Sequence, residues 1–599
     1  MTGGVLLVSM PWAALSAPSM ALSTLAPLVD GHDVTVRYAN LDWAERVGLS
    51  AAEYNTIADS YFAGLGDWVF AGALHGTVER FLPAPAADGV DPEALFATAT
   101  EFIDELAAEI VSADPVFLGL TSTFMQNTAS LALARAVKRA APHIVVALGG
   151  ANCDGEQGAA LARAFDFLDL VVRGEGERAL PAILRALGQP EALSQVDGLC
   201  WRAANGTLVE NPPGPVLPIS ELPEADQSAY FDRLARSPLA GEIRPTLVLE
   251  GSRGCWWGAK HHCTFCGLNG STMAYRAKSP HRVVAELTRA VGRHKVLDVT
   301  FVDNILDVAQ LRAALPEIAE LGWDLRMFFE VKANLRYAEL HGLLRAGVHE
   351  IQPGIENLSS RVLGLMRKGV TGAQNVALLR DCRTLGLTVR WNYLFGFPGE
   401  SDDDYVPIVE RLTDLHHLEP PISAARVQLE RFSPYFTDPE LGLVNLGPSR
   451  IFRQIYPTVP ADELARMVYH FASVPAGISG EPVTALGAAV SAWRAGHDTA
   501  SLRKYAAGDR TLIVDTRAGR NEEYVLSIAE SRCYEALGRP RSRAAVPADD
   551  AVWHRLAELG LVFTEGGRHV ALATGVYDHR QAGGTPGGRP KVEALGGQP

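Results

Sequence analysis

Short, almost continuously apolar runs alternate with helical patterns in the first part of the chain. Such runs are typical of strands buried in a parallel sheet, and they occur at residues 5–9, 33–38, 115–121, 143–148 and 168–173. Helical spacing of apolar residues appears at 19–29, 128–140, 156–165 and 177–187. A more irregular stretch contains Tyr54, Tyr61, Phe62 and Trp68. The alternation predicts a doubly wound α/β domain over residues 1–215, with a β-hairpin at 198–212 that turns at Asn205-Gly206.

After a proline-rich linker at 212–226, the alternation becomes regular between residues 240 and 440. Apolar runs predict strands at 246–250, 297–302, 325–330, 350–356, 388–395 and 424–430. Helical patterns separate these strands at 281–294, 308–321, 337–346, 373–385 and 403–417. A barrel of such βα units uses the carboxyl ends of its strands as its active site. Polar side chains that are costly to bury without partners gather at those ends, namely Asp303, Asn304, Glu330, Lys332, Glu356, Asn392 and Glu430.

The third region, residues 441–575, mixes helices and strands. Helices are expected at 464–473 and 484–495, and strands at 510–515 and 523–527. Residues 549–563 predict a helix that runs into a strand, and residues 566–572 close a hairpin. The tail, residues 576–599, is rich in glycine and proline and is expected to be disordered.

Composition narrows the classes of protein that fit this pattern. The 599 residues are 47% hydrophobic, which supports large buried cores. A net charge of −15 argues against a DNA or tRNA partner, because such partners favour a basic face. The chain opens without a positively charged segment and no apolar run approaches about 18 residues, so we expect no membrane segment. Seven unevenly spread cysteines do not make a secreted disulfide framework, and this favours the reducing cytoplasm.

Three of the cysteines, Cys255, Cys263 and Cys266, lie in one glycine-rich loop that follows the strand at 246–250. Thiolates at this close spacing suit a metal ion or an iron–sulfur cluster. On a [4Fe–4S] cube, three thiolates leave one iron open for an exogenous ligand. With His261 or His262 as a fourth ligand, the same cysteines would form a Cys3His zinc site. The other four cysteines stand alone, and we interpret them as buried or incidental thiols.

The loop at 250–269, placed at the head of six βα units, resembles the cluster loop of radical S-adenosylmethionine (SAM) enzymes, which carry a partial (β/α)6 barrel. A zinc loop has no reason to head such a barrel, so the zinc site is disfavoured. The resemblance implies that the three cysteines hold a [4Fe–4S] cluster, that SAM binds its open iron, and that an electron from the cluster splits SAM into a 5′-deoxyadenosyl radical. An electron donor such as flavodoxin or ferredoxin would reduce the cluster.

The same resemblance assigns SAM-binding roles to residues at the strand ends. Asp303 and Asn304 take the place of the motif that meets the SAM amino group, and Glu330 and Lys332 that of residues that meet the ribose or the carboxylate. The full set that the resemblance assigns to the cofactor is Phe265, Asp303, Asn304, Glu330, Lys332, Glu356 and Asn392.

The first region resembles the cobalamin-binding domain that precedes the barrel in one large class of radical SAM enzymes. The likeness depends on Met10-Pro-Trp and on the glycine-rich stretches at 148–150 and 173–177. It implies that cobalamin lies against loops at the carboxyl ends of the strands, at Met10, Pro11, Thr121, Ser122, Gly149, Gly150, Gly174, Glu175 and Gly176. The Asp-x-His-x-x-Gly motif, whose histidine ligates cobalt, is missing, so we expect no protein histidine ligand. His32 and His143 stand at strand starts, on the wrong edge.

The stretch Ser252-Arg-Gly-Cys-Trp-Trp-Gly, with Cys-Thr-Phe-Cys at 263–266, resembles radical SAM maturases of ribosomally made peptides that act as C-methyltransferases. The resemblance implies that hydrogen is removed from an unactivated carbon of a precursor peptide and that methylcobalamin supplies a methyl group to it. The end of the third region is similar to winged-helix modules that bind the leader of such a peptide by strand addition. Three alternatives stay open: a radical rearrangement without methylation, a small natural-product intermediate as substrate, and a zinc-binding interaction protein.

Overall fold

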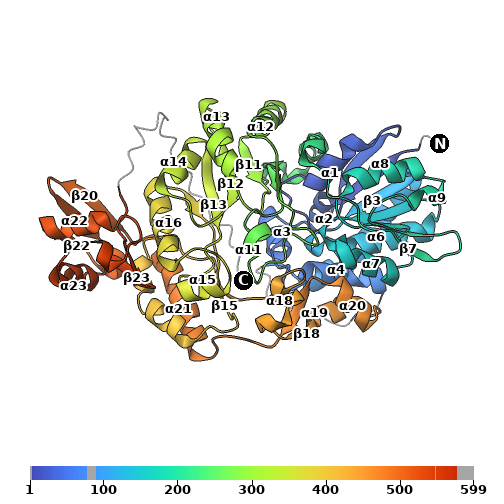
Figure 1. The fold of residues 1–599 in the computed structure, drawn as a ribbon. Helices are drawn as coiled ribbons and strands as arrows, with labels where there is room; N and C mark the ends of the chain where they lie inside the picture. The colour runs from blue at the N-terminus through green and yellow to red at the C-terminus, as the bar shows by residue number, and fades with distance from the viewer. Residues whose placement is uncertain (1–2, 77, 79–88, 547, 576–599) are drawn as a thin grey trace.

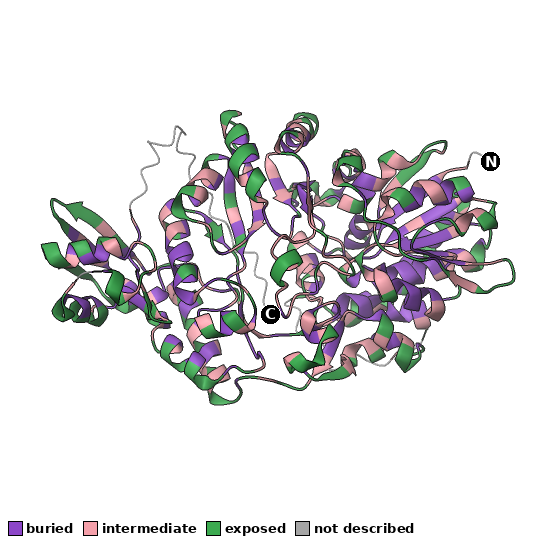
Figure 2. Ribbon diagram, in the orientation of Figure 1, coloured by how far each residue is buried: buried purple, intermediate pink, exposed green. Residues whose placement is uncertain are grey.

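The computed structural model describes residues 3–76, 78, 89–546 and 548–575. The molecule is elongated, with the first region at one end, the middle region at the centre and the C-terminal strands at the other end (Figure 1). Buried residues concentrate in the strands and on the helix faces that cover them (Figure 2). The tail at 576–599, for which the sequence predicts disorder, lies outside the described residues. Within the described ranges, no helix is both long and apolar enough to cross a bilayer.

The first region forms one sheet with strand order β2-β1-β3-β4-β5-β6-β7. Five strands are parallel, namely β1 (Val5–Ser9), β2 (Val34–Tyr38), β3 (Phe117–Thr121), β4 (Val145–Gly149) and β5 (Leu170–Val172). The predicted hairpin, β6 (Leu199–Arg202) and β7 (Leu208–Glu210), joins the edge antiparallel to β5. The strand order reverses between β1 and β3, which is where doubly wound sheets bind their ligands.

Helices cover both faces of this sheet. The predicted helices are present as α1 (Met20–Leu25), α6 (Asn127–Ala140), α7 (Gly155–Ala164) and α8 (Gly176–Ala186), followed by α9 (Pro190–Leu193). The stretch that looks irregular in the sequence is also helical, with α2 (Ala39–Val47), α3 (Ala51–Ala58), α4 (Leu65–His75) and α5 (Pro92–Ala113). α4 packs between α5 and α6 and is buried along most of its length. A helix that is buried on all sides has no polar face, so its sequence lacks an amphipathic pattern.

The middle region forms the predicted strands in chain order, and their pairings with one another are parallel. The predicted strand 424–430 is interrupted after Arg426, and its second half, Leu429–Glu430, pairs antiparallel with residues 470–471 instead. The sheet β14-β13-β12-β11-β8 contains β8 (Leu247–Leu249), β11 (Asp298–Phe301), β12 (Arg326–Val331), β13 (Val348–Pro353) and β14 (Thr388–Val389). The predicted strand 388–395 is interrupted, and its second half, β15 (Tyr393–Phe395), pairs with β16 (Ala424–Arg426). The short antiparallel pair β9 (Ser252–Arg253) and β10 (Arg276–Ala277) brings together the two ends of the cysteine loop.

Most predicted helices of the middle region are present, as α12 (Pro280–His294), α14 (Tyr337–Arg345) and α16 (Gly372–Leu385), with α15 (Ser360–Leu365) in addition. The predicted helix 308–321 contains a π turn, Gln310–Ala314, before α13 (Leu315–Glu320).

The prediction of one helix at 403–417 is wrong, because the segment divides into 3-10 turns at Asp402–Asp404 and Leu412–Leu415 around α17 (Val406–Val409). Asp404 accepts a hydrogen bond from the backbone of Ser401 (2.8 Å), and the Tyr405 hydroxyl donates to Glu400 (2.6 Å). Pro407, at the start of α17, has no backbone N–H to donate to the preceding turn, so a single helix cannot run through this position.

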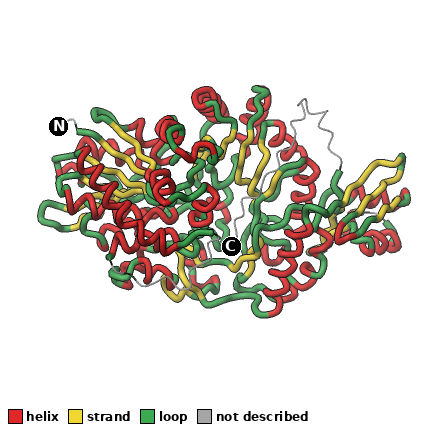
Figure 3. Tube along the Cα trace, turned by 180° about the vertical axis from the view of Figure 1, so that it is seen from behind, coloured by secondary structure: helices red, strands yellow, loops and turns green. Residues whose placement is uncertain are grey.

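The third region lies in two places, which Figure 1 and the rear view in Figure 3 both show. Residues 445–473 return to the first region as β18 (Asn445–Pro448), α19 (Arg450–Ile455), α20 (Ala461–Met467) and β19 (His470–Ser473). α20 packs on α7, where Arg163 Nε lies 2.9 Å from Glu463 Oε1. The predicted helix 464–473 is therefore wrong in its second half. There the chain leaves the helix and pairs, as β19, with β18 and with β17 (Leu429–Glu430).

The rest of the third region begins with a helix that packs on the middle region and then forms the far end of the molecule (Figure 1). It contains α21 (Glu481–Gly496), the antiparallel sheet of β20 (Leu502–Ala507), β21 (Arg510–Asp515) and β22 (Glu522–Val525), α22 (Ile528–Ala536), α23 (Asp550–Glu558), and the hairpin β23 (Val562–Glu565) and β24 (Arg568–Ala571). The hairpin packs against α16 of the middle region.

Candidate functional site

The cysteine loop meets the carboxyl edge of the first sheet. Ser271, which follows the last cysteine, donates its hydroxyl to Asp154 (2.8 Å), in the loop after β4. Arg253, which precedes the first cysteine, donates to Glu175 (2.9 Å), in the loop after β5. The loop itself follows the carboxyl end of β8. The two sheets therefore present their ligand-binding edges to the same space, with α11 (Gly258–His261) between the two regions (Figure 1).

The cysteines Cys255, Cys263 and Cys266 are half-buried and carry free thiols. Burial raises the pKa of Cys266 to about 12 and also raises that of Cys263. Thiols in this position resist ionisation unless a metal or a cation compensates the charge. The Gly258 backbone amide donates to Cys255 Sγ (3.2 Å), the kind of contact that stabilises a thiolate. The other four cysteines are buried, as predicted.

The histidines of the loop have other partners. His262 Nε2 lies 2.9 Å from the carbonyl oxygen of Cys266, and the His261 ring packs on Trp257 with centroids 4.1 Å apart. Within the described part of the chain, no group of three or more His, Cys, Asp or Glu side chains is arranged to hold a metal ion. The same finding covers the three cysteines by themselves, so it does not distinguish the Cys3His zinc site from the cluster.

Asp303 binds the base of the cysteine loop. Its carboxylate accepts hydrogen bonds from the Gly251 amide (3.0 Å) and from the Ser252 hydroxyl. The residue is 4% exposed, and burial raises its pKa to about 6 despite those two bonds. Its neighbour Asn304 is half-buried and donates to Asn269 Oδ1 (2.8 Å) in the cysteine loop. Both residues lie where the sequence predicts, and Asp303 also fixes the position of the loop.

The ends of β12 and β13 place acidic and basic groups together. Lys368 Nζ lies 3.1 Å from Glu356 Oε1, and Lys332 Nζ donates to the backbone carbonyl of Lys368 (2.6 Å). Burial, followed by the charges of Glu356 and Asp303, raises the pKa of Glu330 to about 7. Burial and Lys368 lower the pKa of Lys332 to about 8. Shifts of this size in one cluster are typical of functional sites.

Glu430 and Asn392 differ in their surroundings. Glu430 accepts a hydrogen bond from the Gly267 amide (3.1 Å), next to Cys266, and another from the Tyr469 hydroxyl (3.3 Å). Burial raises the pKa of Glu430 to about 7. Asn392 is exposed in the break between β14 and β15, where it accepts a bond from Ser423 (3.4 Å).

The predicted loops of the first region form a compact edge. Met10 is fully buried, and its carbonyl accepts a hydrogen bond from Gln126 Nε2 (2.8 Å). Ser122 donates to Asn127 Oδ1 (3.0 Å) and accepts from Asn152 Nδ2 (2.9 Å). Thr121 is 8% exposed, and its Oγ1 is buried without a hydrogen-bond partner among the described residues.

Two glycines of this edge depend on having no side chain. Gly150 has φ +112°, and a Cβ there would lie 2.5 Å from the Ser122 carbonyl oxygen. Gly174 has φ +93°. Both are conformations that glycine adopts most readily. His32 and His143 contact Gly3 (3.0 Å) and Asp114 (2.6 Å), at the amino edge, as predicted.

Arg253 is a residue whose role the sequence alone did not reveal. Its guanidinium binds Glu175 (2.9 Å), Glu177 (2.6 Å) and Glu250 (2.8 Å), and Arg276 also binds Glu175 (2.8 Å). The carboxylate of Glu175, predicted to meet cobalamin, is thus engaged by two arginines. The acidic stretch Glu175-Gly-Glu177 was a visible signal, but its basic partners lie 76 to 101 residues further along the chain.

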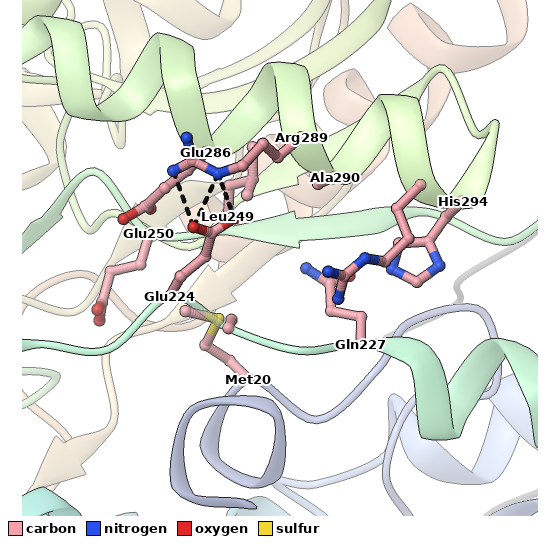
Figure 4. A pocket seen from close by; sticks show the side chains of 11 residues that line it. Met20, Glu224, Gln227, Leu249, Glu250, Glu286, Arg289, Ala290 and His294 are labelled. Atoms are coloured by element: carbon pink, nitrogen blue, oxygen red, sulfur yellow. Dashed lines mark hydrogen bonds and ion pairs between the residues drawn. The ribbon is translucent and has the colours of Figure 1, made fainter. Parts of the chain in front are cut away.

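A recess lies beside the cysteine loop, between α12, the end of β8 and the linker at 224–227 (Figure 4). Its charged walls are paired with each other or with close neighbours. Arg289 binds Glu224 (2.8 Å), and Glu286 binds both Lys278 (2.7 Å) and Arg282 (2.7 Å). These pairs connect the linker to the middle region and support the loop from behind.

Comparison with known proteins identifies the middle region. The model of the radical SAM superfamily matches residues 249–412. These residues are a radical SAM domain. Domains of this superfamily bind a [4Fe–4S] cluster and SAM, which are the cofactors that the sequence predicts for the loop with Cys255, Cys263 and Cys266.

Relatives of the chain include methyltransferases. An uncharacterized methyltransferase of Pyrococcus horikoshii is 25% identical over 305 residues, which are 50% of this chain and 64% of that protein. The hopanoid C-3 methylase of Methylococcus capsulatus is 29% identical over 270 residues, 44% of this chain and 49% of the methylase. The chain thus spans less than two thirds of the length of these relatives.

Solved structures share the fold over a longer span. The cobalamin-dependent SAM radical enzyme OxsB, with aqua-cobalamin and SAM bound, superposes with a TM-score of 0.56 at 15% identity, over 83% of this chain and 67% of that one. The radical SAM methyltransferase TsrM of Kitasatospora setae, with cobalamin and a [4Fe–4S] cluster bound, gives 0.54 at 16% identity, over 83% of this chain and 89% of that one. A span of 83% extends beyond the radical SAM domain and is long enough that it must include part of the first region.

Proposed function

We propose that the protein is a cobalamin-dependent radical SAM C-methyltransferase that acts on a ribosomally made precursor peptide. One observation carries the proposal. The cysteine loop of the radical SAM domain faces the carboxyl edge of a doubly wound sheet, held there by Asp154 to Ser271 and by Glu175 to Arg253. A radical generated at the loop and a cofactor bound on the sheet would then act on the same substrate atom.

The residues of the radical SAM domain fit a cluster and SAM. Cys255, Cys263 and Cys266 would hold the cluster, which would supply the electron that cleaves SAM. Asp303 keeps the loop base in register through Gly251 and Ser252. Asn304 and Glu330 remain at the strand ends for polar groups of SAM, and half-buried Phe265 contributes an apolar face within the loop.

The first region fits cobalamin, which would supply the methyl group. Thr121 offers a buried hydroxyl without a partner in the described structure, and Gly150 lets the backbone after β4 pack directly on Ser122. Apolar side chains stand exposed on the two facing edges, at Phe124 (64%) and Phe62 (48%) on one side and Leu268 (61%) and Val302 (44%) on the other. Exposed apolar surface within such a space favours a large ligand.

The C-terminal strands support the proposal of a peptide substrate. β22 pairs on one side with β21, and its other edge has no strand partner among the described residues. Val525 on β22 is 61% exposed. An open edge with an exposed apolar side chain can accept an extended peptide as an added strand. A small natural-product intermediate is the second candidate, and it would not need this edge.

The test is anaerobic reconstitution of the full chain with iron, sulfide, cobalamin and SAM, followed by mass spectrometry. Formation of 5′-deoxyadenosine together with S-adenosylhomocysteine and a product heavier by one methyl group is expected. 5′-Deoxyadenosine without a methylated product would indicate a radical rearrangement instead. One zinc ion per chain and no sulfide would contradict the proposal that the protein is a radical SAM enzyme. Val525→Lys, which puts a charge on the open edge of β22, should reduce turnover of a peptide and spare that of a small molecule.

A further inference from the structure

Two lysine side chains contact aromatic rings of the cysteine loop. Lys332, at the end of β12, places Nζ 3.3 Å from the centroid of the Trp257 ring, two residues after Cys255. Lys368, after α15, places Nζ 5.8 Å from the centroid of the Phe265 ring, between Cys263 and Cys266. One ammonium group therefore lies close to the loop segment after Cys255, and the other lies close to the segment between Cys263 and Cys266. Cations over ring faces are held by the negative quadrupole of the ring.

The two ammonium groups differ in how their charges are compensated. Lys368 pairs with the carboxylate of Glu356 (3.1 Å). Lys332 has a ring face and the backbone carbonyl of Lys368 (2.6 Å) as its partners, and among the described residues no carboxylate lies within ion-pair distance of it. A half-buried ammonium without an anion is unfavourable. The Sγ atoms of Cys255 and Cys263 are near enough to the Lys332 ammonium for an electrostatic interaction.

Trp257 holds Lys332 in this position. The indole Nε1 donates to the backbone carbonyl of Arg367 (3.1 Å), which fixes the edge of the ring. Gly369 lies under the ring, and a Cβ there would lie 2.3 Å from the indole. Arg367 and Gly369 both have positive φ, +58° and +66°, so the backbone turns sharply where it meets the indole. The lysine is thus directed toward the cysteines by packing as well as by charge.

We propose that Lys332 is the counter-charge of the group bound by the three cysteines and raises the reduction potential of the cluster. The inference rests on the cluster of the proposed function. One-electron reduction, by a flavodoxin or ferredoxin that is itself oxidised by one electron, adds a negative charge to the cluster and no proton. A fixed positive charge beside it favours the reduced form. This role is distinct from the contact with SAM that the sequence assigns to Lys332.

The measurement is the midpoint potential of the cluster in anaerobically reconstituted full-length protein without SAM, followed by electron paramagnetic resonance during a redox titration. Lys332→Gln and Lys332→Met are expected to lower the midpoint potential by about 59 mV. For a one-electron couple, this shift corresponds to a tenfold change in the reduction equilibrium. Lys332→Arg keeps the charge and the ring contact, so its potential should stay near that of the wild type. Lys260→Gln is the matched control, because Lys260 is an exposed residue of the same loop whose charge water screens.

The outcomes separate the inference from the function on which it rests. An unchanged potential in Lys332→Gln, with full iron and sulfide content, would overturn the inference. Weaker binding of SAM by that variant would then assign Lys332 to the SAM carboxylate. Loss of the cluster in Lys332→Gln but not in Lys332→Arg would support the need for the charge. Wild-type protein that binds no iron and no sulfide would contradict the proposed function itself.

Discussion

At the scale of single residues, the cysteine loop and its surroundings contain acidic groups that are costly to ionise because they are buried. The thiols of Cys263 and Cys266 are hard to ionise, because burial raises their pKa. The carboxyls of Asp303 and Glu430 are also hard to ionise, with pKa raised to about 6 and about 7 by burial. A cluster of buried groups that are costly to ionise is typical of a site that binds a ligand or a metal.

Cys263→Ala should abolish cluster binding, because two thiolates cannot hold the cube with one iron open. Iron and sulfide per chain, measured after anaerobic reconstitution, are expected to fall several-fold. Cys533→Ala is the control, since this thiol is buried in the C-terminal region away from the loop and should leave the iron content unchanged. Equal iron in both variants would contradict the assignment.

Asp303→Asn should change how stability depends on pH. The folded pKa of about 6 lies above the ordinary value of 3.8, so the carboxylate is penalised in the folded state as the pH rises between these values. The wild type should therefore lose about 2–3 kcal/mol relative to the variant between pH 4 and pH 7. Urea denaturation of both apoproteins at the two pH values measures this, and a constant difference would refute the prediction.

At the scale of elements, the loops after β3 and β4 form a surface that needs a glycine at one point. Gly150 combines a φ of +112° with direct packing of its α-carbon on Ser122. Any side chain there must displace the β3 loop, which also holds Thr121 and its unpaired hydroxyl. Conformations of this kind are retained where the surrounding structure requires them.

Gly150→Ala should weaken cobalamin binding about tenfold or more, because a strain of about 1–3 kcal/mol acts on the loop itself. Titration of the apoprotein with cobalamin, followed by visible absorbance, gives the affinity. Gly206→Ala is the matched control, since Gly206 has φ +81° in the hairpin turn and open space around it. A similar loss of affinity in both variants would indicate general destabilisation.

At the scale of the whole molecule, charged groups hold the two ligand-binding edges together. Arg253 binds three carboxylates, two from the first region and one from the end of β8. Arg163 and Glu463 join α7 to α20 on another side. The first region is thus connected to the base of the cysteine loop through Arg253, and to the returning segment at 445–473 through Arg163.

Glu177→Gln should destabilise this arrangement by about 1–3 kcal/mol, because a charge-assisted bond to Arg253 is lost at a side chain that is 8% exposed. Glu221→Gln removes an equivalent ion pair, to Arg178, at a side chain that is 52% exposed, and should change stability by less than about 1 kcal/mol. Urea denaturation compares the two. Equal effects would mean that Arg253 does not depend on Glu177.

The sequence by itself determined the local features of this protein. Apolar runs gave the parallel strands of both sheets, and the spacing of the cysteines gave the cluster loop, because both depend on residues near one another in the chain. Periodicity failed at α4, which is buried on all sides, and at β19, where a strand follows directly on α20. The return of residues 445–473 to the first region was also invisible, since it depends on contacts with α7.

Only the tertiary structure decided how the local features combine. In the structure, Glu175 binds Arg253 and Arg276, and Lys332 contacts Trp257. The sequence predicts cofactor contacts for both Glu175 and Lys332. Ion pairs and ring contacts form between groups that folding brings close, and sequence separation does not limit them. The chain therefore encodes its chemistry locally, while the partners that tune that chemistry come from distant elements.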